Sequence, residues 1–175
     1  MKYLCQSKDN VLILWVDDNQ NIYWFIYTSI ASHGDYKSHT GVCTSIGKGM
    51  FCSFSNKQKS NAQSSIEAKL NGIDYKISKV VCVKCFLKCQ GFVINNTVIF
   101  QDNQSAMKLE NNGTESTGKR TYHFNIKLFY VKDLMKQGVM KIDYCHSDSM
   151  IADYLSKPLN SVKFNEFKKR IMNLK

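Results

Sequence analysis

Two aspartates are the first candidates for chemistry in this 175-residue sequence. Asp102 directly follows the short apolar run TVIF, and Asp153 lies in the late segment IADYLSKPL. Carboxylates that meet from strand ends and facing helices can hold two Mg²⁺ ions about 3.5–4 Å apart, an arrangement that hydrolyses phosphodiester bonds. Each aspartate also has a simpler interpretation. Asp102 could cap the helix that follows it, and Asp153 could be a solvated acid in a first helical turn.

Cysteines are the second set of reactive side chains. Cys82, Cys85 and Cys89 have helical spacing, and a zinc site there would need a fourth ligand that is not close in sequence. We therefore expect these three to pack as small apolar side chains in the core. The seven cysteines are an odd number without tight disulfide spacing. This usage predicts a reducing, intracellular compartment, either the cytoplasm or the nucleus.

The charge and hydropathy of the sequence indicate which class of partner the protein binds. The sequence has 24 Lys and Arg against 14 Asp and Glu, a formal net charge of +10. Such an excess favours a polyanion, most often nucleic acid, although a solvated basic surface is the alternative. The start MKYLCQSKDN lacks the apolar centre of a signal peptide, and no apolar run approaches the roughly 20 residues of a membrane helix. We expect a soluble protein without a membrane partner.

The first part of the sequence predicts an antiparallel meander. Residues 21–31 (NIYWFIYTSIA) are rich in aromatic and β-branched side chains, which is typical of a buried strand. Residues 41–46 and 50–55 alternate around Gly47-Lys48-Gly49, which is a hairpin signal. Three consecutive strands are therefore expected to pair in chain order.

Helices and strands alternate in the rest of the sequence. Ser64 or Ser65 can cap a helix whose apolar period continues to about Lys88, and Gly91 ends it. The order β-β-β-α-β-α-α-β-α predicts an α/β fold, a mixed sheet covered by helices. The other expected elements are a strand at 97–100, a helix at 105–109, a loop at 110–120, a helix at 122–137, a strand at 139–145, a segment from 149 interrupted at Pro158, and a basic helix at 162–173.

Six short blocks in a fixed order carry a family resemblance. They are DYKSHTG (35–41), GKG (47–49), SNKQKSNAQSSIEAKL (55–70), QDNQSAMKLENNG (101–113), KRTYHFNIKLFYVKD (119–133) and IADYLSKPL (151–159). Together they resemble the RNase H domain of copia-type LTR retrotransposon Pol polyproteins. In that family a helix bears an S-S-T-E-A-E-like string, a strand ends in D-N-Q-S-A, and a late segment contains A-D-x-x-T-K-P-L.

The resemblance implies a fold and a domain organisation. The fold would be an RNase H-like mixed five-stranded sheet, an antiparallel meander followed by crossover strands, with helices on both faces. Residues 1–20 would be a remnant of the connection after a reverse transcriptase, and residues 21–175 the RNase H-like domain. The chain would be a degenerate C-terminal fragment of such a polyprotein.

The resemblance also implies an activity, which is hydrolysis of the RNA strand of RNA–DNA hybrids with Mg²⁺ as cofactor. The partners would be the hybrid and the reverse transcriptase region of the parent polyprotein. Four acids bind the metals in the family, and two of them match here as Asp102 and Asp153. Tyr27 and Lys69 occupy the other two positions. Because a lysine repels a divalent ion, we expect weak or absent Mg²⁺ binding and absent or very weak hydrolysis.

Other assignments of the acids remain open. A shifted register could give the first role to Asp17 or Asp18, but both precede the strand and leave Tyr27 unexplained. Glu67 lies two positions before Lys69 and so points away from that face of the helix. We expect Lys69 to pair with one of the two matching aspartates in the place of a metal ion, and Tyr27 to fill space as a neutral side chain.

Basic residues on two predicted helices are candidates for binding the hybrid, because cations neutralise phosphates without sequence readout. A solvated polar face is the alternative. Tyr122 stands where the family often has a basic residue, which weakens this prediction, and His123 is more consistent with a structural than a catalytic role. The candidates are Lys119, Arg120, Lys127, Lys163, Lys168, Lys169 and Arg170.

Three functions therefore compete. The chain could be an active two-metal nuclease with a different carboxylate set, an impaired RNase H-like domain that at most binds nucleic acid, or an unrelated basic scaffold that uses the helical cysteines for zinc. Tyr27 and Lys69 favour the second. The order of the six blocks argues against the third.

Overall fold

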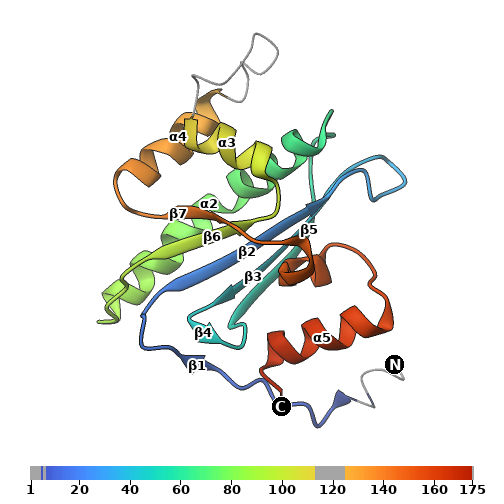
Figure 1. Cartoon of the computed structure of the whole chain (residues 1–175), viewed down its shortest axis with the longest axis vertical. Coiled ribbons are helices and arrows are strands. Elements are labelled where there is room, and N and C mark those ends of the chain that lie inside the picture. The colour runs from blue at the N-terminus through green and yellow to red at the C-terminus, as the bar shows by residue number, and fades with distance from the viewer. Residues whose placement is uncertain (1–4, 6, 113–124, 175) are drawn as a thin grey trace.

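A mixed five-stranded sheet forms the centre of the molecule in the computed structural model, which describes residues 5, 7–112 and 125–174 (Figure 1). The strand order is β5-β3-β2-β6-β7. β2 pairs with β3 and β3 with β5 in antiparallel fashion, whereas β2, β6 and β7 run parallel. The predicted meander and crossover strands are therefore confirmed. The strands span Ile22–Ser29 (β2), His39–Ser45 (β3), Cys52–Lys57 (β5), Thr97–Gln101 (β6) and Lys141–Tyr144 (β7).

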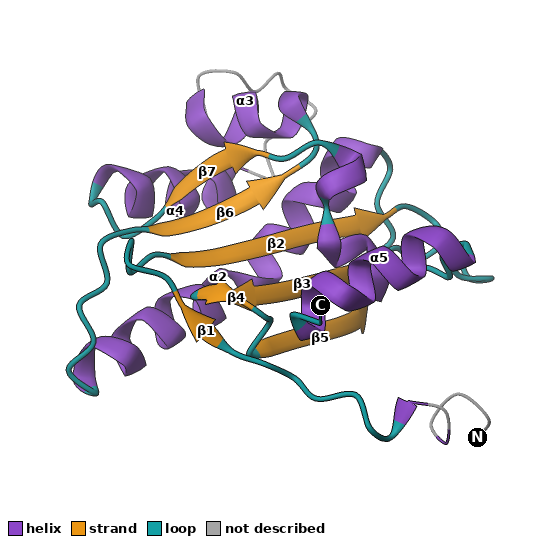
Figure 2. Cartoon of the chain, turned by 60° about the horizontal axis from the view of Figure 1, so that its bottom comes forward, coloured by secondary structure: helices purple, strands orange, loops and turns teal. Residues whose placement is uncertain are grey.

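The two faces of the sheet are covered by different helices, as Figure 2 shows. On one face Trp24 of β2 joins a core cluster with side chains of α2 (Ser65–Cys89) and α4 (Asn125–Lys136). On the other face Phe25 packs with side chains of the 3₁₀-helix η4 (Ile151–Leu155) and of α5 (Ser161–Met172). Successive residues of a strand point to opposite faces, so the alternating burial of β2 supplies both cores. The prediction of helices on both faces is confirmed.

The long helix α2 begins where the sequence predicts. Ser64 is its N-cap, and the Ser64 hydroxyl accepts a hydrogen bond from the Glu67 amide at 3.1 Å. The Glu67 carboxylate in turn accepts from the Gln63 amide at 2.8 Å. The first bond satisfies a backbone donor that the first helical turn leaves free, and the second ties the residue before the cap to the helix. The helix ends before Gly91, whose φ of +87° is a left-handed conformation that favours glycine.

The prediction that the three cysteines of α2 lie in the core is wrong. Cys82, Cys85 and Cys89 are all exposed. The buried stripe of this part of the helix passes instead through Val80 and Lys84. The helical period alone did not distinguish the cysteine stripe from the stripe of Val80 and Lys84, because apolar residues occur on both.

Three further segments differ from the sequence-based expectation. Gly47–Lys48 is not only a hairpin turn, because as β4 it pairs with β1 (Trp15–Val16) in a small second sheet. α3 spans Gln104–Asn112 and so extends into the predicted loop. The segment from residue 149 is not an α-helix, because η3 (Ser147–Ser149) and η4 form two 3₁₀ turns.

Among the described residues, no helix is long and apolar enough to cross a membrane.

Candidate functional site

The carboxyl ends of β2 and β6 bring the site together. The parallel register pairs Phe25 with Phe100, and Tyr27 and Asp102 each follow two residues later in the chain. Lys69, in the second turn of α2, reaches this point from the neighbouring helix. Its ammonium pairs with Asp102 Oδ1 and lies 5.3 Å from the centre of the Tyr27 ring. Three of the four positions singled out in the sequence therefore meet.

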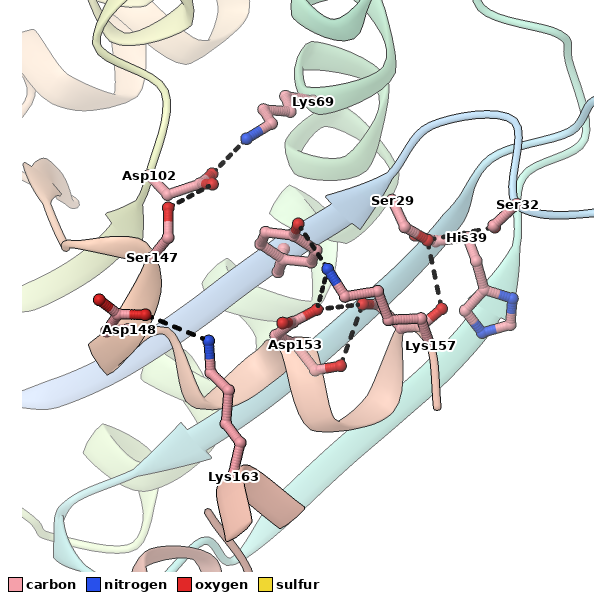
Figure 3. A network of polar contacts seen from close by, with 12 residues as sticks. Ser29, Ser32, His39, Lys69, Asp102, Ser147, Asp148, Asp153, Lys157 and Lys163 are labelled. Carbon is pink, nitrogen blue, oxygen red and sulfur yellow. Dashed lines mark hydrogen bonds and ion pairs between the residues drawn. The ribbon is translucent and has the colours of Figure 1, made fainter. Parts of the chain in front are cut away.

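Asp102 contacts Lys69 on one side and Ser147 on the other (Figure 3). The side chains of Lys69 and Asp102 are only 11% and 8% exposed, so their ion pair is shielded from solvent. Ser147 of η3 lies 3.5 Å from the other carboxylate oxygen. Asp102 does not cap α3, because Asn103 accepts the hydrogen bond from the Ala106 amide at 3.0 Å. The capping interpretation is therefore wrong, and Lys69 pairs with an aspartate as expected.

Asp153 completes the group from the opposite face of the sheet. It lies in η4 and is 4% exposed, so the interpretation as a solvated acid is wrong. Its Oδ1 accepts from Ser156 Oγ at 2.9 Å and is 3.2 Å from the ammonium of Lys157. Lys157 also donates to the Tyr27 hydroxyl at 3.3 Å. Tyr27 thus lies between two lysines, each of which pairs with one aspartate.

Lys157 is a site residue that the sequence reasoning missed. Partial burial by itself would lower the pKa of Lys157, but the hydrogen bond to Tyr27 and the charge of Asp153 outweigh that effect and raise the pKa. The ammonium is therefore charged at neutral pH. A signal was present, because Lys157 follows Asp153 by four residues, a spacing that allows oppositely charged side chains to pair.

The charges of the site do not fit a pair of Mg²⁺ ions. Asp102 and Asp153 carry two negative charges, and Lys69 and Lys157 carry two positive ones, so the sum is zero. Mg²⁺ requires several oxygen ligands and favours a negative site. Across the described ranges, no three His, Cys, Asp or Glu side chains are grouped in a way that could hold a metal ion. This holds for the helical cysteines as well as for the acids.

The alternative acids lie elsewhere in the fold. Glu67 is engaged in capping α2. Asp17 is 3.5 Å from the hydroxyl of Tyr23, at the beginning of β2. Tyr23 and Tyr27 are four residues apart on a strand, which corresponds to about 13 Å. The structure therefore does not support a first acid at Asp17.

The predicted basic residues are only partly covered by the structure. Lys119, Arg120, Tyr122 and His123 lie outside the described residues, as does the side chain of Lys127. The remaining candidates are on α5, which packs against η4 and so borders the Asp153 side of the site. There Lys163 is 3.4 Å from Asp148, Lys169 is exposed, Lys168 is half-buried, and Arg170 donates to the Ser149 carbonyl at 3.4 Å.

Comparison with known sequences gives two informative relatives. No family model matches this chain. It is 24% identical over 173 residues to the retrovirus-related Pol polyprotein from transposon RE2 of Arabidopsis thaliana, covering 98% of this chain and 12% of that protein. It is 26% identical over 138 residues to the corresponding polyprotein from transposon RE1 of the same plant, covering 78% of this chain and 9% of that protein. The chain therefore spans only a small part of these relatives.

Comparison with solved structures identifies the fold. LC11-RNase H1 in complex with an RNA/DNA hybrid matches with a TM-score of 0.55 at 11% identity, over 78% of this chain and 94% of that one. The protease-reverse transcriptase of prototype foamy virus matches with a TM-score of 0.53 at 8% identity, over 91% of this chain and 22% of that one. The RNase H-like fold and the resemblance to retrotransposon Pol polyproteins are both confirmed.

Proposed function

We propose that this RNase H-like domain of a retrotransposon Pol polyprotein binds RNA–DNA hybrids but does not cleave them by the two-metal route. The observation that carries the proposal is the enclosed ion pair between Lys69 and Asp102. It fills the place where a second acid would have to share a metal ion with Asp102. The ancestral activity would be hydrolysis of the RNA strand of the hybrid.

Electrostatics supports the loss of hydrolysis. A lysine ammonium about 4 Å from a divalent ion repels it by several kcal/mol, even at an effective dielectric constant of about 20. Tyr27 offers a neutral hydroxyl where an acid would have offered a charged oxygen ligand. A metal ion would therefore have to displace Lys69 from Asp102 and find fewer ligands after doing so. Mg²⁺ is then a cofactor of the ancestral site, with weakened or absent binding here.

The proposed domain organisation follows the resemblance. Residues 21–175 would form the RNase H-like domain, and residues 1–20 would derive from the connection to a reverse transcriptase. The reverse transcriptase region would be the partner in the parent polyprotein. The hybrid in the LC11-RNase H1 structure supports nucleic acid as the ligand class, as does the formal net charge of +10.

A cleavage assay on a labelled RNA–DNA hybrid, in Mg²⁺ and in Mn²⁺, tests the proposal. The natural chain and Asp102→Asn should both leave the hybrid intact. The double variant Tyr27→Asp with Lys69→Glu should cut it, because it restores four carboxylates. Adding Asp102→Asn to the double variant should abolish that activity, whereas adding Asp143→Asn, at an exposed aspartate of β7, should not.

Two results would contradict the proposal. Cleavage by the natural chain that Asp102→Asn abolishes would show a working nuclease with a different carboxylate set. A folded double variant that binds the hybrid without cutting it would show that the four positions are wrongly assigned.

A further inference from the structure

We infer that lysine ammonium groups replace divalent cations at this site, so that the domain holds a nucleic-acid phosphate without Mg²⁺. The inference rests on the proposed function, because it concerns the same ligand and the same site. The structural basis is that each of the two aspartates has its own lysine, Lys69 for Asp102 and Lys157 for Asp153.

Neutralisation of the carboxylates is the first requirement. A phosphate that approaches two unpaired aspartates is repelled, and in a metal-dependent site the cations remove this repulsion. Here Lys69 removes it from inside the protein, because its side chain is 11% exposed and its ammonium contacts Asp102 directly. Lys69 is too enclosed to be the main contact of an external anion. It acts as a positioning residue, because its charge removes the repulsion that the Asp102 carboxylate would exert on a phosphate.

A direct contact to the phosphate is the second requirement, and Lys157 is placed to supply it. An ammonium group has three N–H donors. Two of those of Lys157 are directed to Tyr27 and Asp153, and 42% of its side chain is exposed to solvent. The third donor can therefore reach an anion outside the protein. Tyr27 holds the ammonium in place by accepting a hydrogen bond that an alanine or phenylalanine could not accept.

Basic residues of α5 lie beside the site. Lys163 lies across η3 and η4 from Lys157 and is 27% exposed beside Asp148 (Figure 3). Arg170 lies on the same helix and contacts the carbonyl of Ser149. A nucleic-acid backbone that places one phosphate at Lys157 can thus bring neighbouring phosphates towards further cations.

Lys157 agrees with the sequence pattern of the family, whereas Lys69 departs from it. Lys157 matches the lysine of the A-D-x-x-T-K-P-L string, so a contact through it is compatible with the family pattern. Lys69 stands where the family string has an acid. Independence from Mg²⁺ is therefore a property that Lys69 confers, and variants of the Lys69–Asp102 pair should change it.

Fluorescence anisotropy with a labelled RNA–DNA hybrid, in EDTA and in Mg²⁺ at equal ionic strength, tests the inference with the full chain. Mg²⁺ should not lower the Kd of the natural chain by more than about twofold, and its competition for the phosphates can only raise the Kd. Asp102→Asn removes one negative charge and leaves Lys69 uncompensated, so it should tighten binding by about threefold. Lys157→Met should weaken binding by about three- to tenfold in both conditions.

Lys69→Met provides the sharpest comparison, because it returns an unpaired Asp102 to the site. Its binding should be weaker in EDTA and should recover when Mg²⁺ is added. Lys88→Met is the matched control, since Lys88 is exposed on the same helix about 28 Å away along its axis. Circular dichroism should verify that each variant is folded. If Lys69→Met does not fold, Asp102→Asn, which conserves the size of the side chain, tests the same ion pair.

The outcomes separate the inference from the proposed function. Absence of hybrid binding in both conditions would overturn both. Binding that requires Mg²⁺ in the natural chain would overturn the inference and leave nucleic-acid binding intact. Binding in EDTA that Lys157→Met affects no more than Lys88→Met would place the hybrid elsewhere on the domain and likewise overturn the inference.

Discussion

Glu110 is a fully buried acid of α3 that the functional site does not use. Burial raises the pKa of its carboxyl to about 8, although the neighbouring Gln101 amide acts in the opposite direction. The group is therefore protonated in the folded chain at neutral pH, while in the unfolded chain its pKa is near the ordinary value of 4.5. The folded state binds the extra proton. The free energy of unfolding is therefore highest below pH 4.5 and decreases as pH rises towards 8.

Glu110→Gln should remove this pH-dependent cost. Glutamine has nearly the same shape and no proton to lose, so the gain in the free energy of unfolding should grow from near zero at about pH 4 to up to about 4 kcal/mol at about pH 7.5. Urea unfolding at several pH values measures this difference. Glu166→Gln, at an exposed position of α5, is the control and should show no such trend. A gain that is the same at every pH would contradict the explanation.

Residue identities predicted part of the candidate site. Tyr27, Lys69, Asp102 and Asp153 were singled out from the sequence blocks, and the structure brings all four to one end of the sheet. Lys157 was not included, although its ammonium adds one positive charge to the site. Its role depends on how η4 turns, and that 3₁₀ geometry does not follow from the spacing of apolar residues.

At the scale of elements, α2 and β2 approach each other closely at Gly72. A Cβ atom there would lie 2.4 Å from the Thr28 hydroxyl and 3.4 Å from the side chain of Thr40. These two hydroxyls are themselves hydrogen-bonded at 3.1 Å inside the molecule. The absence of a side chain at Gly72 thus lets the helix that carries Lys69 lie against the strand that carries Tyr27.

Gly72→Ala should therefore destabilise the domain although alanine favours helices. The overpacking costs about 1–3 kcal/mol, which exceeds the gain of up to about 1 kcal/mol in helix propensity. Thermal unfolding followed by circular dichroism should show a lower midpoint than for the natural chain. Gly34→Ala is the control, because no atom lies within 4 Å of its Cβ position. An equal or higher midpoint for Gly72→Ala would show that the helix can shift without cost.

Elements with strong local signals were predicted well, and those set by distant contacts were not. The cap at Ser64 and the aromatic and β-branched run of β2 act within a few residues, so both elements begin within one residue of the expected position. β1 exists because Trp15 and Val16 pair with Gly47–Lys48, which is a contact between distant parts of the chain. The same reason explains the exposed cysteines, since only packing decides which stripe of α2 faces the sheet.

At the scale of the whole molecule, the formal net charge of +10 predicts that the proposed binding to nucleic acid depends on salt. Each lysine that neutralises a phosphate releases about one counterion, so it adds about one to the steepness of the fall in affinity with salt. Lys169→Gln on α5 should reduce the slope of log K against log salt by about one. Lys79→Gln, at an exposed position of α2, should leave the slope unchanged. Equal slopes for the natural chain and Lys169→Gln would remove α5 from the binding surface.

The ion pair between Lys69 and Asp102 also changes the relation between activity and folding. Acidic side chains that are clustered in an active site repel one another, so a catalytic site lowers the stability of the fold that carries it. Under the proposed function, Lys69 turns that repulsion into attraction to Asp102, so the same change that would remove a metal ligand would also stabilise this edge of the sheet. Selection against unfolding and selection for catalysis then act in different directions on this edge of the domain. On this proposal, the fold would persist through sequence drift even after a loss of activity.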